Sequence, residues 1–218
     1  MSYEKGTVIN ISSVNKPMRG QVIVEDVYDG VTLYSLANDT DIPVQRNINY
    51  HCLFLLMGKL NVYTRDRLSI KESKEIFGGQ AIVLPLNEPV GSTVLDDSVA
   101  VEVTLGRKID GDKVHSMEPF RPRDMVRYQP GRAVQETIFT SGFVVFNICA
   151  LDMNTEMNGL KGTGEQILTG LEGEGIICYK GKEFVMHAGE NFRVEHDVEY
   201  GLKTVNTQFK VSQLIHVE

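Results

Sequence analysis

The sequence predicts an all-β protein made of two β-barrels in tandem. Three observations lead to this prediction: β-branched residues form short runs with a period of two, glycines separate the runs, and the second half repeats glycine spacings of the first. No window of eleven or more residues has the period of an amphipathic helix, and Ser69–Ile76 is at most one helical turn. Short strands with turn residues at this spacing are typical of a sandwich or a barrel.

The two halves of the sequence repeat one another, which is the basis for predicting two barrels. Leu55–Gly58 aligns with Gly170–Gly173 at an offset of 115 residues, and Gly79–Leu84 aligns with Gly189–Val194 at an offset of 110. The two offsets differ by five residues, and the extra residues fall in the charged segment Arg65–Glu75, which we expect to be a longer hairpin loop in the first copy.

A segment between the two copies, Met117–Asp124, carries two prolines and is typical of a connector. We therefore predict an N-terminal barrel at residues 1–112, a connector at residues 113–125 and a C-terminal barrel at residues 126–218. Each barrel is long enough to form a core without disulfides or metals.

Composition and charge restrict the classes of partner. The chain of 218 residues is 42% hydrophobic, which is ordinary for a globular protein, and its formal net charge is −7. An acidic chain without a basic block is not expected to bind nucleic acid or an anionic membrane. The longest apolar stretch, Cys52–Met57, is far shorter than the ~18 residues of a membrane span.

The cysteines and the N-terminus predict a cytoplasmic protein. Cys52, Cys149 and Cys178 lie far apart and form no C-x-x-C pair, so we expect reduced, buried thiols. The N-terminal residues lack the apolar core of a signal peptide.

The spacing of the glycines resembles the two motifs of the cupin family, G-x5-H-x-H-x3-4-E-x6-G and G-x5-P-x-G-x2-H-x3-N. Gly173 falls at the end of the first motif and Gly189 at the start of the second, and Gly58, Gly79 and Pro85 fall on the corresponding positions of the first copy. The chain thus resembles a two-domain cupin, or bicupin, over nearly its whole length. The resemblance implies two double-stranded β-helix (jelly-roll) barrels in tandem and a chain that can pair into a homodimer through edge strands.

The metal ligands of the cupin motifs are replaced in both copies. Metal-binding cupins bring three histidines and one glutamate to one point, where they hold a transition metal. The aligned residues here are Leu160, Gly162, Gln166 and Tyr200 in the second copy, and Gln45, Asn47, His51 and Val90 in the first. Apolar side chains cannot bind a metal and neutral amides bind transition metals weakly, so we expect no metal and no cofactor. A shift of one residue in the alignment would exchange Gln166 for Glu165, and this alternative stays open.

The aligned positions of the first copy can form a ligand site without a metal. Gln45, Asn47 and His51 are expected to alternate onto the inward face, with Tyr34 and Arg46 nearby. An imidazole beside two amides can orient a polar ligand or act as a general acid–base. The alternative is a hydrogen-bonded core histidine.

In the second copy, Gln166 and Tyr200 are expected to face the space beside Gly162. Tyr200 either donates a hydrogen bond to a ligand or fills the space where a metal would otherwise lie. Four arginines of the connector region form a separate candidate, which either binds a carboxylate or phosphate or is a solvated surface: Arg121, Arg123, Arg127 and Arg132.

Taken together, these features favour a cupin-like protein without a metal centre, which binds a small molecule or acts as a non-catalytic interaction or regulatory module. The alternative is a metal-independent isomerase or epimerase with His51 as its base, which needs a carboxylate that no short spacing supplies. A metal-dependent dioxygenase or isomerase is disfavoured by the replaced ligands. We expect any small organic ligand in the first barrel, beside His51.

Overall fold

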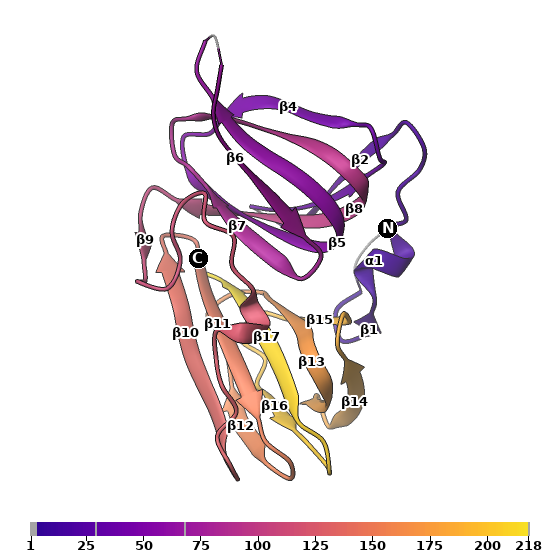
Figure 1. The fold of residues 1–218 in the computed structure, drawn as a ribbon. Helices are drawn as coiled ribbons and strands as arrows, with labels where there is room; N and C mark the ends of the chain where they lie inside the picture. Colours follow the sequence, from indigo (N-terminus) through magenta and orange to yellow (C-terminus); the bar gives the residue numbers. More distant parts are fainter. Residues whose placement is uncertain (1–3, 29, 68, 218) are drawn as a thin grey trace. The chain divides into compact units, whose positions relative to one another are not determined.

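The structure, a computed structural model, describes residues 4–28, 30–67 and 69–217, and its architecture is almost entirely β (Figure 1). The helical segments of these residues are two short turns, α1 (Ile11–Val14) and η1 (Pro122–Asp124). The helical turn predicted at Ser69–Ile76 is wrong, because β6 (Ile70–Phe77) pairs with β5 (Tyr50–Arg65) as a strand. No helix in the described ranges is long and apolar enough to cross a membrane.

The chain divides into two compact units, and the division lies in the predicted connector. The N-terminal unit is Ser12–Arg121, and the C-terminal unit is Pro122–Glu218 together with Met1–Ile11. The first eleven residues thus differ from the prediction: β1 (Val8–Ile9) pairs antiparallel with β15 (Asn191–Val194) of the C-terminal unit. A strand of two residues has no periodic pattern that could indicate its partner.

The N-terminal unit is built on two long strands that bend. The strands of its sheet are β2 (Val22–Tyr28), β3 (Val31–Leu36), β4 (Asp41–Arg46), β5, β6, β7 (Gln80–Leu84) and β8 (Pro89–Gly106), while the two-residue β9 (Ile109–Asp110) is not part of this sheet. The sheet order is β2-β3-β8-β5-β6, with β4 on β8 and β7 on β5. The first part of β5 pairs with β7 and the second with β6, while β8 pairs with both parts. The register shifts around Met57 and Lys59, so the sheet folds over a core that includes Leu53, Leu55 and Ala100.

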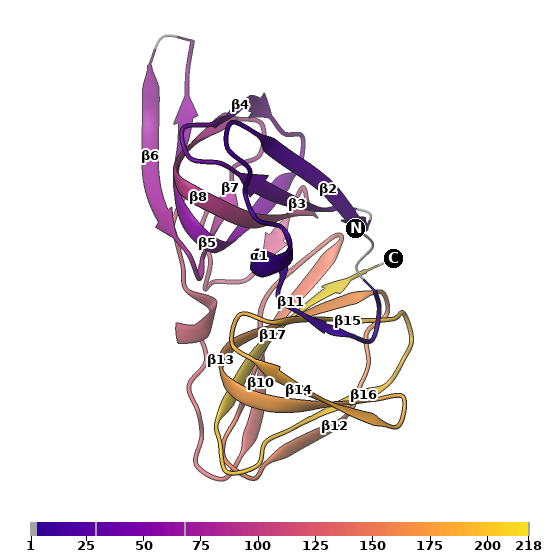
Figure 2. The same cartoon turned by 90° about the vertical axis from the view of Figure 1, so that its right-hand side faces the viewer.

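The C-terminal unit follows the same plan with β13 as its long strand. Its remaining strands are β10 (Ala133–Ser141), β11 (Val144–Leu151), β12 (Glu156–Leu160), β13 (Gln166–Tyr179), β14 (Lys182–His187), β16 (Tyr200–Lys203) and β17 (Phe209–His216). The first part of β13 pairs with β15 and β17, and its second part pairs with β14 and β16 (Figure 2). The enclosed core includes Leu168, Phe192 and Phe209.

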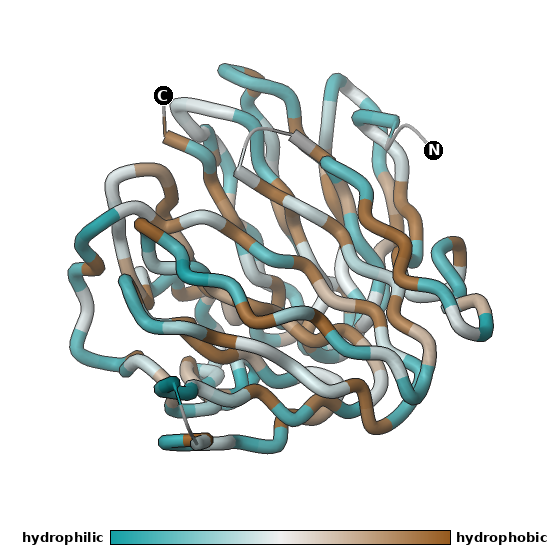
Figure 3. The backbone as a smooth tube through the Cα atoms, turned by 90° about the horizontal axis from the view of Figure 1, so that it is seen from above, coloured by the Kyte–Doolittle hydropathy of each residue, from teal (hydrophilic) through white to brown (hydrophobic). Residues whose placement is uncertain are grey.

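The glycines that aligned in the sequence occupy equivalent backbone positions. Gly58 in β5 and Gly173 in β13 have φ angles of 91° and 74°, and each lies where its long strand bends. The amide of Gly79 donates to the carbonyl of residue 55 at 2.7 Å, and the amide of Gly189 donates to the carbonyl of residue 170 at 2.8 Å. Along the strands, hydrophobic and hydrophilic residues alternate with the period of two (Figure 3).

Candidate functional site

A polar cluster lies on the inward face of β3, β8 and β5 in the N-terminal unit, and its members are Tyr34, Glu102 and His51. Strand β8 runs between β3 and β5, so Glu102 has the other two side chains as diagonal neighbours. Glu102 follows the core residue Ala100 by two positions, and His51 precedes the core residue Leu53 by two. Strand alternation therefore turns both side chains toward the core, against which Tyr34 also packs.

The centre of this cluster is a close contact between an imidazole and a carboxylate. Nδ1 of His51 lies 2.7 Å from Oε1 of Glu102, and the two side chains are 17% and 18% exposed. Because a carboxylate only accepts hydrogen bonds, Nδ1 donates, and Nε2 is the ring nitrogen that remains for another group. No hydrogen bond of Nε2 is found among the described residues. The orientation of the imidazole is thus fixed, and the two side chains are mostly buried but keep some contact with solvent.

Tyr34 completes the cluster as a second donor to Glu102. Burial raises the pKa of Tyr34 to about 12, and the negative charge of Glu102 and the hydrogen bond to its carboxylate act in the same direction, as does the charge of Asp26. The hydroxyl therefore keeps its proton across the neutral range. Of the two residues expected near His51, Tyr34 joins the cluster, whereas Arg46 is exposed and no described hydrogen bond or ion pair joins it to His51.

The two amides predicted to accompany His51 are not brought to it. Gln45 is exposed and Asn47 is half-buried, and no described hydrogen bond joins either side chain to His51. The inward alternation predicted along this segment is wrong: β4 is an edge strand that pairs with β8 alone, Ile42 packs against the core, and Gln45, an odd number of residues further along, is exposed.

Glu102 is the residue that sequence reasoning missed. It belongs to a strand that meets β5 only after the sheet has folded, so no short spacing links it to His51. One signal was present: Glu102 is the only charged residue in the β-branched run Val99–Leu105, at the inward position of that run.

In the C-terminal unit, the inward positions are filled by a buried hydrogen-bond network. The hydroxyl of Tyr200 donates to Oε1 of Gln166 at 2.9 Å and accepts from Nε2 of Gln213 at 2.7 Å. Gln213 in turn accepts from Asn147 at 3.4 Å. Tyr200, Gln166 and Gln213 are at most 3% exposed. Of the two roles open to Tyr200 from the sequence, filling the space is the one this geometry supports.

The alternative between Glu165 and Gln166 is resolved by the same network. Gln166 faces inward, while Glu165 turns away and pairs with Arg193 and Lys5. Gly162 makes room for Gln166, because a Cβ at this position would lie 2.5 Å from its amide nitrogen. Glycine at position 162 therefore leaves the space that the inward-facing side chain of Gln166 occupies.

Replacing Tyr200 with Phe is expected to lower the free energy of unfolding by about 2–6 kcal/mol. The substitution leaves a buried oxygen of Gln166 and a buried N–H of Gln213 without their partner, at about 1–3 kcal/mol each. Urea denaturation measures the change, and Tyr50→Phe, whose hydroxyl has no described hydrogen bond, serves as the control with an expected change below about 0.5 kcal/mol. Equal stability of the two variants would show that the network contributes nothing.

The positions that hold the metal in metal-binding cupins do not fit a transition metal here. Burial, and then the neighbouring Cys149, raise the pKa of Tyr200 far above its ordinary range, and its hydroxyl is already bound by Gln166 and Gln213. Leu160 and Val90 offer no donor atom. Among the residues that the structure describes, no group of three or more His, Cys, Asp or Glu side chains could hold a metal ion. No reaction step is therefore derived through a metal.

Comparisons with known proteins agree with this architecture at the level of the fold. No protein-family model matches the chain, and no curated protein matches it. Among solved structures, a cupin 2 conserved barrel domain protein from Leptotrichia buccalis is 18% identical, with a TM-score of 0.86 and 98% of each chain covered. A salicylate 1,2-dioxygenase from Pseudaminobacter salicylatoxidans is 12% identical, with a TM-score of 0.63 over 89% of this chain and 75% of that one.

A variant of oxalate decarboxylase from Bacillus subtilis is 7% identical, with a TM-score of 0.59 over 99% of this chain and 78% of that one. At these identities the likeness is one of fold. The chain therefore has the all-β fold of cupin-domain proteins.

Proposed function

We propose that the two compact units are two cupin barrels in tandem and that the N-terminal barrel binds a small, neutral, hydroxyl-bearing molecule without a metal. The observation that carries the proposal is the inward-facing pair of His51 and Glu102, 2.7 Å apart and still 17–18% exposed. Polar groups that serve only the core are expected to be fully buried and fully paired with one another. His51 and Glu102 remain partly exposed, which favours a role in binding.

The chemistry of the cluster selects the kind of ligand. Glu102 fixes the imidazole through Nδ1, so Nε2 of His51 accepts a hydrogen bond from a ligand hydroxyl. The carboxylates of Glu102 and Asp26 give the region around Tyr34 a negative potential. Anionic ligands are disfavoured there, and neutral molecules such as sugars or polyols are favoured.

The C-terminal barrel has a structural role in this proposal. Its inward polar positions are taken by Tyr200, Gln166 and Gln213, which bind one another, and Nε2 of Gln166 is the one atom of these three side chains that is buried without a described partner. A ligand at this place would have to displace a packed tyrosine and break two buried hydrogen bonds.

A thermal-shift screen tests the proposal with neutral sugars, polyols and small carboxylic acids on the wild type, His51→Ala and His187→Ala. His187 is the matched control, because it also pairs with a glutamate, Glu174, but at 3.3 Å and with a side chain 56% exposed. A compound at about 100 times its Kd stabilises the folded state by about 2.7 kcal/mol, which for a chain of this size is a rise in Tm of about 5–10 °C.

We expect neutral hydroxyl compounds to raise the Tm of the wild type and of His187→Ala, and to leave that of His51→Ala unchanged. The proposal fails if the same compounds stabilise His51→Ala as strongly as the wild type.

The same cluster favours a second candidate, a metal-independent isomerase or epimerase. Glu102 is the orienting carboxylate that such an enzyme needs beside its base, and Tyr34 is a protonated hydroxyl on the other side of it. Nε2 of His51 would take a proton from a carbon next to a carbonyl group and return it to the same carbon or to its neighbour. Incorporation of solvent deuterium into a bound ligand, followed by proton NMR, separates this candidate from binding alone.

A further inference from the structure

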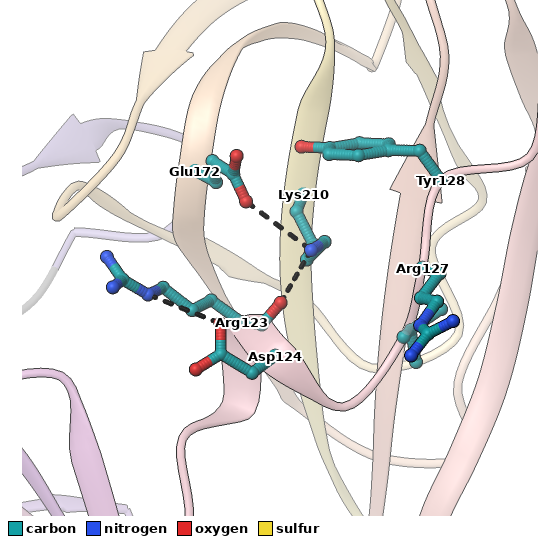
Figure 4. Close-up of a pocket in the computed structure, with 7 residues that line it drawn as sticks. Arg123, Asp124, Arg127, Tyr128, Glu172 and Lys210 are labelled. Carbon is teal, nitrogen blue, oxygen red and sulfur yellow. Dashed lines mark hydrogen bonds and ion pairs between the residues drawn. The ribbon is translucent and has the colours of Figure 1, made fainter.

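A second polar site lies in the C-terminal unit, beside η1 and away from the inward network of Tyr200. It is an open pocket of about 420 Å³. Its polar lining consists of Arg123, Asp124, Arg127, Tyr128, Glu172 and Lys210 (Figure 4).

Lys210 forms the floor of this pocket as a nearly buried cation. Its side chain is 6% exposed, and its ammonium lies 2.5 Å from the carbonyl oxygen of Arg123 and 3.4 Å from the carboxylate of Glu172. The ring of Tyr128 covers the ammonium, with 4.6 Å between the nitrogen and the ring centroid. An ammonium has three N–H donors, so one remains for a further acceptor.

Two other donors of the pocket have no partner in the described part of the chain. The hydroxyl of Tyr128 is buried and forms no hydrogen bond. The guanidinium of Arg127 is exposed and takes part in no described hydrogen bond or ion pair. An unpaired buried hydroxyl is costly and rare in folded proteins, and a ligand acceptor at this place would satisfy it.

The charges of the pocket define the ligand further. Three of its side chains are basic (Arg123, Arg127 and Lys210) and two are acidic (Asp124 and Glu172), so one positive charge is in excess. This balance suits a monoanion better than a phosphate dianion. The carboxylate of Glu172 stands beside the donors and accepts a hydrogen bond from a ligand hydroxyl or amine.

We propose that this pocket binds a small monocarboxylate that also carries a hydroxyl or amino group. The ligand carboxylate accepts hydrogen bonds from the hydroxyl of Tyr128, from Arg127 and from the remaining N–H of Lys210, while its own donor meets Glu172. Of the four arginines that the sequence singled out, Arg123 and Arg127 belong to the site, and Arg121 and Arg132 do not line it.

NMR titration of the full ¹⁵N-labelled chain with glycolate, acetate and inorganic phosphate tests the ligand class. We expect amide shifts confined to residues 123–128, 172 and 210, with a Kd for glycolate at least three times lower than for acetate and lower than for phosphate. Tighter binding of phosphate, equal binding of acetate, or shifts spread over surface arginines would overturn the proposal.

Substitutions test the donors one by one. Tyr128→Phe keeps the ring over Lys210 and removes the unpaired hydroxyl, so we expect an equal or higher Tm together with glycolate affinity at least five-fold weaker. Arg127→Ala is expected to weaken glycolate binding to a similar extent. Arg132→Ala, a surface arginine outside the pocket, and His51→Ala, in the other unit, should bind glycolate like the wild type. A Tyr128→Phe variant with a lower Tm or with unchanged affinity would contradict the assignment.

Discussion

Gly173→Ala is expected to lower the free energy of unfolding by about 3–5 kcal/mol, whereas Gly181→Ala is expected to lower it by about 1 kcal/mol. The two glycines have nearly the same backbone, with φ angles of 74° and 72°. A Cβ on Gly173 would overlap the backbone carbonyl oxygen of Gln208, whereas one on Gly181 would meet no atom within 4 Å. Because the backbone conformations are alike, the difference in unfolding free energy between the two variants measures the effect of the close contact between strands at the bend of β13.

Urea denaturation of both variants measures this difference directly. Gly58→Ala, at the bend of β5, should behave like Gly173→Ala, because a Cβ there would overlap the backbone of Asp97. If Gly173→Ala and Gly181→Ala have the same stability, the bend does not depend on contact between the strands.

Glu102→Leu is expected to weaken binding of the N-terminal ligand about 10- to 100-fold and to lower the free energy of unfolding by about 1–3 kcal/mol. The loss of binding follows from the loss of a charged hydrogen bond that orients His51, which is worth about 1.5–3 kcal/mol. Stability falls because the N–H of His51 and the hydroxyl of Tyr34 lose their acceptor, and the partial exposure of the pair moderates the loss.

Glu102→Gln is the matched control for this substitution, since its side-chain oxygen still accepts from Nδ1 of His51. We expect its affinity to lie between those of the wild type and Glu102→Leu, as measured by calorimetric titration with the strongest compound of the screen. If the Glu102→Leu variant binds the compound like the wild type, the carboxylate of Glu102 does not contribute to binding.

The parts of the fold that the sequence predicted are those specified by local pattern. Gly58 and Gly173 aligned at an offset that the structure explains, since each bends a long strand at a positive φ. The strand period and the glycine positions are properties of neighbouring residues and are readable without a fold. The edge position of β4, on which Gln45 is exposed, and the pairing of β1 depend on partners distant in sequence, so no local pattern reports them.

In the candidate site, too, the residues that were predicted follow from local sequence pattern, and those that were missed depend on contacts distant in sequence. His51 was found because it falls on a motif position, and the inward placement of Tyr200 and Gln166 was predicted because both fall on motif positions of one copy, whereas the hydrogen bond between them was not predicted. Glu102 was not found, because its proximity to His51 results from the pairing of β5 with β8. The buried hydroxyl of Tyr128 could not be anticipated either, since the burial of a single atom depends on packing around it.

The central claim is that His51 receives a ligand through Nε2 while Glu102 holds Nδ1. The histidine ring nitrogens of the ¹⁵N-labelled protein, recorded with and without the strongest neutral compound of the screen, test it most directly, and the His51→Ala variant assigns the His51 signals among those of the five histidines. We expect the compound to shift the Nε2 signal of His51 and to leave the ring signals of His187 and His196 in place. A compound that binds the protein while the ring signals of His51 stay unchanged would contradict the account.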